Sequence, residues 1–350
     1  MGAIFGLGMT HVPLLAGRDE DMARILRRVL QDPDLPARYR TPGGWPEPMR
    51  GEWGTDEGLA AARRHRHALV EWCRKARRAL DAFGPDLVVV WGDDQYENFR
   101  DDIIPAFCVL AYEAIEHRPW ADAPWANVWG EPKDTTFVFK GHRPAAKRLA
   151  GRLLEDGFDA AYAYRPLHHA LGHAFMNTLL FLDYDRQGFP YPVVPFAVNC
   201  YGRRVVAQHG GLGALAAVDA EDRLDPPSPP PWRCFDLGRA CARFFAASPW
   251  RVALVASSSW SHAFLVPKHH LLYPDVPADR AMYETLRAAD WDAWRNTPLA
   301  AMEDSGQQEM LNWMCLAGAM AELGRRPSES AFIESHIFNS NKVFALFPPA

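Results

Sequence analysis

Short apolar runs alternate with amphipathic stretches along most of this chain. Continuous apolar runs of strand length predict β-strands at residues 3–8, 87–91, 103–112, 160–164, 193–198 and 251–257. Apolar positions at helical spacing predict helices at residues 19–30, 59–83, 144–157, 174–182, 236–247, 279–296 and 307–323. Strands and helices in alternation are typical of an α/β fold, in which helices flank a central sheet.

We therefore expect a single α/β domain over residues 1–350, with a mostly parallel or mixed sheet and long loops over the strand ends. Within it, residues 19–58 contain a helix and a loop rich in Pro, Gly and Trp, which we interpret as an insertion. We interpret residues 224–232, which contain the tract PPSPPP, as an extended surface loop, because strands and helices continue on both sides of it.

The charge balance and the cysteine pattern exclude several classes of protein. The 350 residues include 38 Lys and Arg against 43 Asp and Glu, a net charge of −5. This balance argues against nucleic-acid or anionic-membrane partners, which are bound by clustered excess Lys and Arg. No segment approaches the about 20 apolar residues that a membrane-spanning helix needs. The six cysteines are scattered without a CxxC pair, as is typical of reduced thiols, so we expect a cytoplasmic protein.

Polar groups able to bind a metal or to transfer protons follow four of the predicted strands. They are His11, the cluster Asp93, Asp94, Gln95 and Glu97, the cluster His168, His169 and His173, and His262. A further candidate, Glu309, begins a helix that is otherwise largely apolar. Because α/β sheets build ligand sites at the carboxyl ends of their strands, we expect these groups to meet in one cavity. Taken alone, Asp93 and Asp94 are interpreted as turn and cap residues.

Seven segments occur in the order and approximate spacing of a known family. They are GMTHVP (8–13), WGDDQYENF (91–99), IIPAF (103–107), KGH (140–142), VPFAVN (194–199), SWSH (259–262) and EMLNW (309–313). Together they resemble the class III extradiol ring-cleaving dioxygenases, the superfamily of the protocatechuate 4,5-dioxygenase β subunit. Residues 19–58 and the segment FNSNK (338–342) are more similar to the single-chain branch that includes 3-O-methylgallate dioxygenase.

The resemblance implies an Fe(II) ion held by two histidines and one glutamate, the 2-His-1-carboxylate arrangement of non-haem iron oxygenases. His11 matches the first histidine, and Glu309 matches the glutamate. At the position of the second histidine this chain has Gln95, whose amide oxygen is a poorer ligand for Fe(II) than imidazole. Glu97 is the nearest residue that would compensate, and Asp94 is another, so the identity of the third ligand stays open.

The resemblance also implies roles for three further histidines. His262 matches the family's active-site base, which takes a proton from a hydroxyl of the catechol. An imidazole suits this task because its pKa lies near neutrality. His173 resembles the family's histidine near substrate and O₂, and His169 is nearly as good a match.

The implied activity is the opening of the ring of a catechol- or gallate-type aromatic acid with O₂, a step of aromatic-compound catabolism. We expect a homo-oligomer, a dimer, on the same grounds, and Arg203, Arg204 and Lys342 are candidates to bind the substrate carboxylate. Gln95 also supports an alternative, a metal-poor or non-catalytic binding protein of the same fold. A metal-dependent hydrolase would use the same carboxylates to activate water, although the chain has no HExxH signature.

Overall fold

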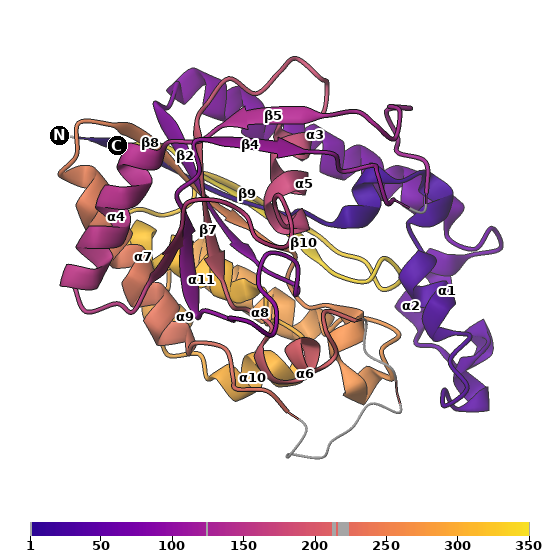
Figure 1. The fold of residues 1–350 in the computed structure, drawn as a ribbon. Helices are drawn as coiled ribbons and strands as arrows, with labels where there is room; N and C mark the ends of the chain where they lie inside the picture. Colours follow the sequence, from indigo (N-terminus) through magenta and orange to yellow (C-terminus); the bar gives the residue numbers. More distant parts are fainter. Residues whose placement is uncertain (1, 124, 212–214, 216–223, 350) are drawn as a thin grey trace.

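The computed structural model describes residues 2–123, 125–211, 215 and 224–349. Among these residues, eight strands form one mixed sheet in the order β6-β3-β7-β2-β8-β1-β10-β9 (Figure 1). These strands are β1 (Ala3–Met9), β2 (Leu87–Asp93), β3 (Phe107–Leu110), β6 (Ala161–Ala163), β7 (Val193–Val198), β8 (Arg251–Ser257), β9 (Glu329–Ile333) and β10 (Lys342–Phe347). A separate antiparallel pair consists of β4 (Ala114–His117) and β5 (Phe137–Lys140). The expected α/β class with a mixed central sheet is confirmed.

The four central strands, β7, β2, β8 and β1, are parallel to one another. Their register brings the carboxyl ends level, because Ser257 of β8 pairs with both Met9 of β1 and Gly92 of β2, and Asp93 pairs with Val198 of β7. At one edge, β10 and β9 are added antiparallel, and at the other, β3 is antiparallel to β7. The residues that follow these four strands therefore come together at one edge of the sheet.

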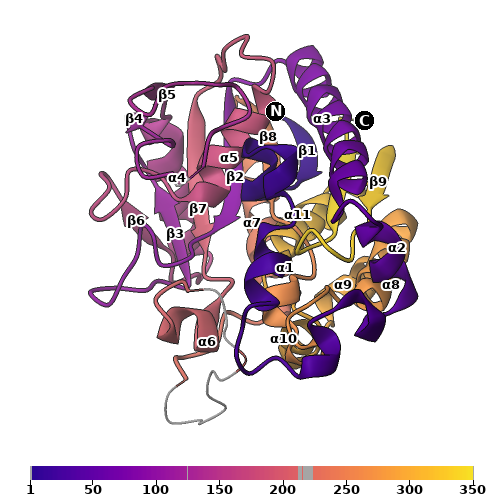
Figure 2. The same ribbon diagram turned by 90° about the vertical axis from the view of Figure 1, so that its right-hand side faces the viewer.

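Helices cover both faces of the sheet, as Figures 1 and 2 show. One face packs on α1 (Arg24–Val29), α2 (Glu47–Trp53), α3 (Leu59–Phe83) and α5 (His173–Leu182). The other packs on α4 (Arg143–Glu155), α7 (Pro231–Ala246), α9 (Trp291–Arg295) and α11 (Met310–Glu322). Alternate residues of β2 serve the two cores, with Val88 and Val90 on the first face and Leu87 and Val89 on the second.

The closest helix packing joins α7 and α11, and it depends on two glycines. A Cβ added at Gly238 would lie 1.8 Å from the carbonyl oxygen of Cys315, and one at Gly318 would lie 1.9 Å from that of Phe235. Each glycine thus lets the backbone of the other helix approach closely. This packing fixes α11, whose first turn adjoins the carboxyl ends of the central strands.

The remaining helices lie near those strand ends: α6 (Gly202–Ala207), α8 (Val276–Ala288) and α10 (Leu299–Asp304). The single helix predicted over 279–296 is wrong, because Ala289 adopts a left-handed conformation (φ 55°) and Asp290 caps the separate helix α9. The predicted strand at 103–112 is shorter, and Ile103 is exposed before β3 begins. Helix α7 begins at Pro231, inside the Pro-rich tract, since Pro is well suited to the first turn of a helix.

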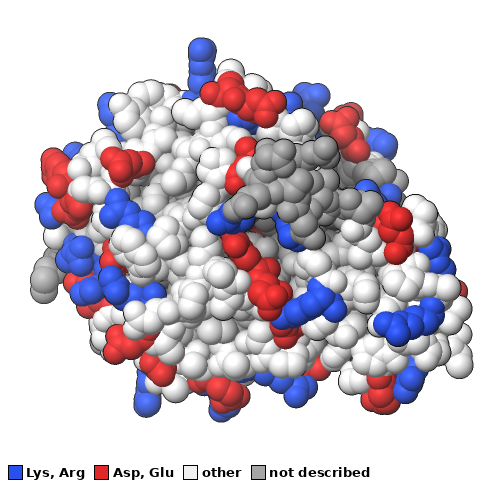
Figure 3. All heavy atoms as spheres, turned by 90° about the horizontal axis from the view of Figure 1, so that it is seen from below, with Lys and Arg blue, Asp and Glu red and all other residues white. Residues whose placement is uncertain are grey.

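One face of the molecule carries charged side chains of both signs. Figure 3 shows Lys and Arg interspersed with Asp and Glu on the described residues of the face seen from below. Within the part of the chain that the structure describes, no helix combines the length and the apolar character needed to cross a membrane.

Candidate active site

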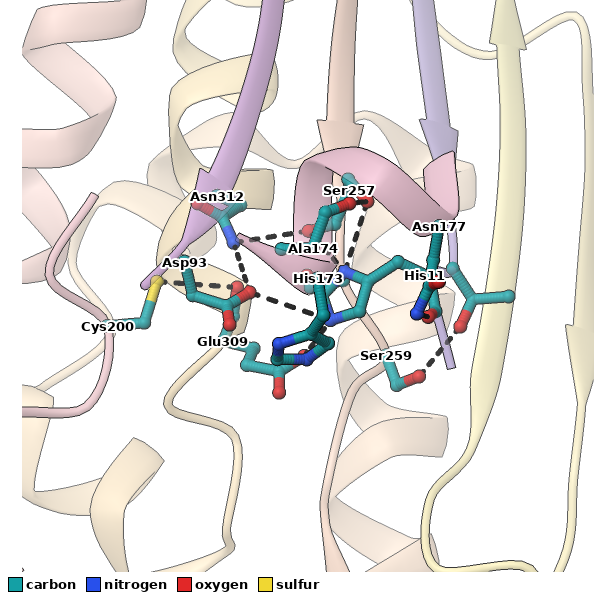
Figure 4. A network of polar contacts seen from close by, with 12 residues as sticks. His11, Asp93, His173, Ala174, Asn177, Cys200, Ser257, Ser259, Glu309 and Asn312 are labelled. Carbon is teal, nitrogen blue, oxygen red and sulfur yellow. Dashed lines mark hydrogen bonds and ion pairs between the residues drawn. The ribbon is translucent and has the colours of Figure 1, made fainter. Parts of the chain in front are cut away.

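Side chains able to bind a metal converge beyond the ends of the parallel strands. They are His11 after β1, Asp93 at the end of β2, Tyr201 after β7, His262 after β8, His173 at the start of α5 and Glu309 just before α11. In Figure 4 the side chains of His11, Asp93, His173 and Glu309 point toward one another below the strand ends. The level register of the four strands is what brings these distant positions together.

Three short distances define the centre of the site. His11 Nε2 lies 3.6 Å from Glu309 Oε2 and 3.7 Å from Asp93 Oδ1. The other oxygen of Glu309, Oε1, lies 3.2 Å from His262 Nε2. All four residues are buried. The structure thus brings together His11, His262 and Glu309, which the sequence analysis singled out.

The imidazole of His11 is held in the form that can bind a metal. Its Nδ1 lies 3.1 Å from the carbonyl oxygen of Ser257, which can only accept, so Nδ1 carries the hydrogen and Nε2 presents its lone pair to the two carboxylates. Burial lowers the pKa of His11 well below its ordinary value, and the neighbouring His173 and His262 lower it further. The ring is therefore neutral at physiological pH.

The two carboxyl groups opposite His11 are buried, and burial favours their protonated forms. Burial raises the pKa of Asp93 to about 7. Burial and the charge of Asp93 raise the pKa of Glu309 well above its ordinary value. Asp93 Oδ2 and Glu309 Oε2 are buried without a hydrogen-bond partner among the described residues. A divalent cation fits this set, because it would occupy the unpartnered oxygens and displace the protons that burial favours.

His173 lies beside this set and is paired with Glu97. The ligand atoms of His11, Asp93 and His173 all lie within 4.8 Å of one another. The Nδ1 of His173 lies 2.8 Å from Glu97 Oε2, an oxygen that also accepts the backbone N–H of His173. Burial lowers the pKa of His173, but the charge and hydrogen bond of Glu97, with Asp93 and Glu309, outweigh it and raise that pKa to about 10. His173 is therefore an imidazolium when no metal is bound.

The structure places the remaining sequence-predicted residues around this centre with other partners. Gln95 Nε2 donates to the carbonyl oxygen of Gly210 at 2.8 Å. Asp94 accepts the backbone N–H groups of residues 97, 98 and 99, as expected of a cap residue. The ring of His169 packs against His117 at a centroid distance of 5.0 Å, and its buried Nδ1 has no hydrogen-bond partner in the described part of the chain. Asp93, interpreted from the sequence as a turn or cap residue, is the last residue of β2, and its side chain faces His11.

The chain is similar in sequence to several curated dioxygenases. It is 31% identical over 205 residues to the 2,3-dihydroxyphenylpropionate/2,3-dihydroxicinnamic acid 1,2-dioxygenase of Comamonas testosteroni. The aligned region covers 59% of this chain and 51% of that protein. It is 30% identical over 202 residues to a Pseudomonas putida protein of the same activity, covering 57% and 51%. A Klebsiella pneumoniae protein of that name is 25% identical over 305 residues, covering 73% and 83%.

The chain is a relative of these dioxygenases. The resemblance inferred from the seven sequence segments is thereby confirmed. The chain spans about half the length of the first two curated relatives that it matches. No protein-family model matches the chain.

Two residues of this chain that contact the site, Tyr201 and Asn312, were not predicted from the sequence. Tyr201 donates a short hydrogen bond from its hydroxyl to Glu309 Oε1. Asn312, one turn into α11, donates from Nδ2 to Asp93 Oδ1 at 3.3 Å and to the carbonyl oxygen of Ser257 at 3.2 Å. The position of Tyr201 three residues after the apolar run of β7 was a usable signal. Asn312 had none, because its partners lie far away in the sequence.

Proposed function

We propose that this chain is a non-haem Fe(II)-dependent extradiol dioxygenase that opens the ring of a catechol-type aromatic acid with O₂. The names of the relatives support a dioxygenase acting on an aromatic acid with adjacent hydroxyls. The observation that carries the proposal is the neutral His11 imidazole facing two buried carboxyl groups, each with an oxygen that has no hydrogen-bond partner among the residues described. Such a donor set of imidazole and carboxylate suits Fe(II).

His11 Nε2, Asp93 and Glu309 would hold the ion. Asp93 then takes the place of the second histidine that the resemblance implied, where this chain has Gln95 and where Glu97 and Asp94 were the other candidates. One histidine and two carboxylates would thus serve as ligands. When bound, Fe(II) would act as a Lewis acid toward the diol and would carry electrons from the diol, which is oxidised, to O₂, which is reduced. Asn312 would orient Asp93, and Ser257 would orient His11.

The surrounding side chains would move and hold protons. Burial and the charge of Lys342 lower the pKa of His262 to about 3, well below the near-neutral value expected from the sequence, so its ring is neutral in the metal-free protein. Its Nε2 contacts Glu309, whereas its buried Nδ1 has no partner among the described residues and would accept a proton from the diol. His173, held as an imidazolium by Glu97, would place positive charge beside the oxygens of the ionised diol.

A cavity of about 510 Å³ lies beside Tyr201 and Gln308 and would give the substrate a route to this centre. Its lining includes Tyr201, which bonds Glu309, and Phe264, whose ring lies 5.4 Å from that of His262. Its volume is within the range of small-molecule pockets. Arg203 and Arg204 line the cavity and remain candidates for the substrate carboxylate. Lys342 is no longer a candidate for this role, since it is buried and its Nζ donates to two backbone carbonyl oxygens.

Metal reconstitution and oxygen uptake test the proposal together. Metal-free protein is loaded anaerobically with Fe(II), its metal content is measured, and O₂ uptake is followed with 2,3-dihydroxyphenylpropionate, protocatechuate and gallate. We expect stoichiometric iron and O₂ uptake that requires the diol and yields a coloured ring-opened product. Protein loaded with redox-inert Zn²⁺ is the matched control and should consume no O₂. Failure to retain any divalent metal would instead support the non-catalytic binding protein.

Two further parts of the proposal follow from the resemblance. We propose a homodimer, which equilibrium sedimentation of the reconstituted protein would show. We also propose a cytoplasmic location, which the six buried free cysteines support because thiols persist in a reducing compartment.

A further inference from the structure

Asp279 is a fully buried carboxylate that connects three segments of the chain. It lies in the first turn of α8, and none of its surface is exposed. The backbone N–H of Ser261 donates to both of its oxygens, at 3.1 and 3.0 Å. Gln307 Nε2 donates to Oδ1 at 2.6 Å, and Asn341 Nδ2 donates to Oδ2 at 2.7 Å. One side chain thus accepts hydrogen bonds from segments that are far apart in the sequence.

Two of these donors adjoin residues of the candidate active site. Ser261 directly precedes His262, and Gln307 lies two residues before Glu309. The segments of His262 and Glu309 also contact each other, since the backbone N–H of His262 donates to the carbonyl oxygen of Gly306 at 2.8 Å. Asp279 therefore bonds to both segments whose side chains meet at 3.2 Å between His262 Nε2 and Glu309 Oε1.

The third donor belongs to a loop that supports His262 from its other side. Asn341 accepts the backbone N–H of Trp260 on its carbonyl oxygen at 3.0 Å. Asn339 accepts that of Ala263 at 2.6 Å, and His262 forms an isolated β-bridge with Ser340. The backbone on both sides of His262 is therefore bonded to the loop that Asp279 holds through Asn341.

A carboxylate is not needed at position 279 merely to fill the space there. Burial raises the pKa of Asp279 to about 7, because desolvation outweighs the hydrogen bonds that it accepts. An apolar side chain that fills the same space avoids this cost, and buried charges replaced in that way are often neutral or stabilising. What an apolar side chain cannot do is accept hydrogen bonds from three segments at once.

We infer that Asp279 is a positioning residue, which fixes the imidazole of His262 against Glu309 by bonding Ser261, Gln307 and Asn341. It acts through these residues and does not itself touch substrate. The inference rests on the proposed function only in that His262 is the group whose position matters for turnover.

Two substitutions at this position separate hydrogen bonding from structural disruption. Asp279→Ala removes every acceptor. In Asp279→Asn the remaining side-chain oxygen can still accept hydrogen bonds from the backbone N–H of Ser261 and from Asn341 Nδ2. The amide of Asn341 keeps its orientation, because its Oδ1 accepts the backbone N–H of Ser335. The NH₂ group of the new Asn can donate to Gln307 Oε1 if the amide of Gln307 flips. After the flip, Gln307 Nε2 faces Ser305 Oγ, which donates to Gln307 Oε1 in the wild type but can also accept a hydrogen bond. The Asn variant is therefore expected to rescue the position.

The experiment compares iron-loaded wild type, Asp279→Ala, Asp279→Asn and Asp290→Ala. Asp290 is the matched control, because it is exposed, makes none of the hydrogen bonds of Asp279, and its loss costs only a helix cap. We expect kcat per bound iron to fall about 10- to 100-fold in Asp279→Ala, with KM and iron content within about twofold of wild type. Asp279→Asn and Asp290→Ala should keep most of kcat. An unchanged kcat per iron in Asp279→Ala, or no rescue by Asn, would overturn the inference.

A second measurement does not depend on turnover. Ring resonances of His262 in the metal-free protein, identified by their absence in His262→Ala, should shift and broaden in Asp279→Ala and stay near wild type in Asp279→Asn. Identical His262 resonances in all three proteins would overturn the inference. If wild type binds iron but consumes no O₂ with any diol, the proposed function fails, while these resonances still decide the role of Asp279. If Asp279→Ala does not fold, Gln307→Met removes a single donor and should give a smaller change of the same kind.

Discussion

His11 Nε2 and Glu309 Oε2 lie 3.6 Å apart, although the two residues come from opposite ends of the chain. β1 carries the first residue to the edge of the sheet, and the packing of α11 on α7 carries the second to the same edge. Both side chains are buried, and one of them is a carboxyl group whose second oxygen contacts His262. This pair links the candidate metal ligands to the candidate base.

Replacing Glu309 should remove the metal. We expect Glu309→Ala to lower Fe(II) affinity by at least about 100-fold, because it deletes a charged ligand from a set of three. Isothermal titration with Fe(II) under anaerobic conditions measures this change. Glu322→Gln, near the other end of α11 where Glu322 pairs with Arg239 and Arg243, is the control and should bind normally. Unchanged iron binding by Glu309→Ala would remove Glu309 from the ligand set.

Substitutions of Asp93 and Gln95 should affect Fe(II) affinity differently, because we propose Asp93, and not Gln95, as the third ligand. Asp93→Asn keeps the shape of the side chain but removes its charge, so we expect Fe(II) affinity to fall about 10- to 100-fold. Gln95→Ala loses a hydrogen bond to Gly210 and should change affinity by less than about threefold. The same titration compares both variants with wild type. The reverse order of effects would restore Gln95 as the ligand implied by the family resemblance.

His262→Ala should separate chemistry from metal binding. The iron content should stay at the wild-type level, while kcat falls by about 10²- to 10⁴-fold, the usual contribution of a general base. Iron analysis and O₂ uptake on the same sample give both values. His67→Ala, at an exposed position of α3, is the control and should keep full turnover. Loss of iron together with turnover would show that His262 is a ligand or supports one.

The stability of the protein should depend on pH through Asp279. Burial raises the pKa of its carboxyl group to about 7 from 3.8, so the folded chain binds this proton more tightly than the unfolded chain. Its contribution to the free energy of unfolding is therefore greatest at low pH and decreases as pH rises between these values, by up to about 1.4 kcal/mol per pH unit.

Urea unfolding of the metal-free protein measures this dependence. Between about pH 5 and about pH 8, wild type should lose stability relative to Asp279→Asn, whose amide does not titrate. The difference between the two proteins isolates this one group from other titrating residues. A difference that does not change with pH would contradict the raised pKa.

The contact between α7 and α11 should tolerate no side chain at Gly318. A Cβ there would lie 1.9 Å from the carbonyl oxygen of Phe235, so we expect Gly318→Ala to lower the free energy of unfolding by about 1–3 kcal/mol. Gly151→Ala on α4 is the control, since nothing lies within 4 Å of a Cβ there. This change should raise stability by about 0.5–1 kcal/mol. Equal effects in denaturant unfolding would contradict the close approach of the two helices.

Local patterns predicted the elements whose signal lies within one stretch of sequence. The helix at 59–83 and the strands at 193–198 and 251–257 have the predicted bounds, because long apolar periodicity and the stop at Gly84-Pro85 are local properties. The strands β9 and β10 were missed. β10 is stabilised by antiparallel pairing with β1 at the other end of the chain, and no local pattern encodes that partner.

By itself, the sequence predicted that imidazole and carboxyl groups follow the apolar runs of an α/β fold, and the family resemblance implied that His11, His262 and Glu309 belong to one site. Only the tertiary structure decided which residue at the end of β2 or in the loop after it faces that site. Asp93 is still held in the sheet by its pairing with Val198, so its direction follows from the strand. Gln95 lies in a turn that Asp94 caps and that continues through the left-handed Tyr96 (φ 61°). Pairing between strands that are distant in the sequence sets the directions of these side chains, so they cannot be predicted from the order of residues along the loop.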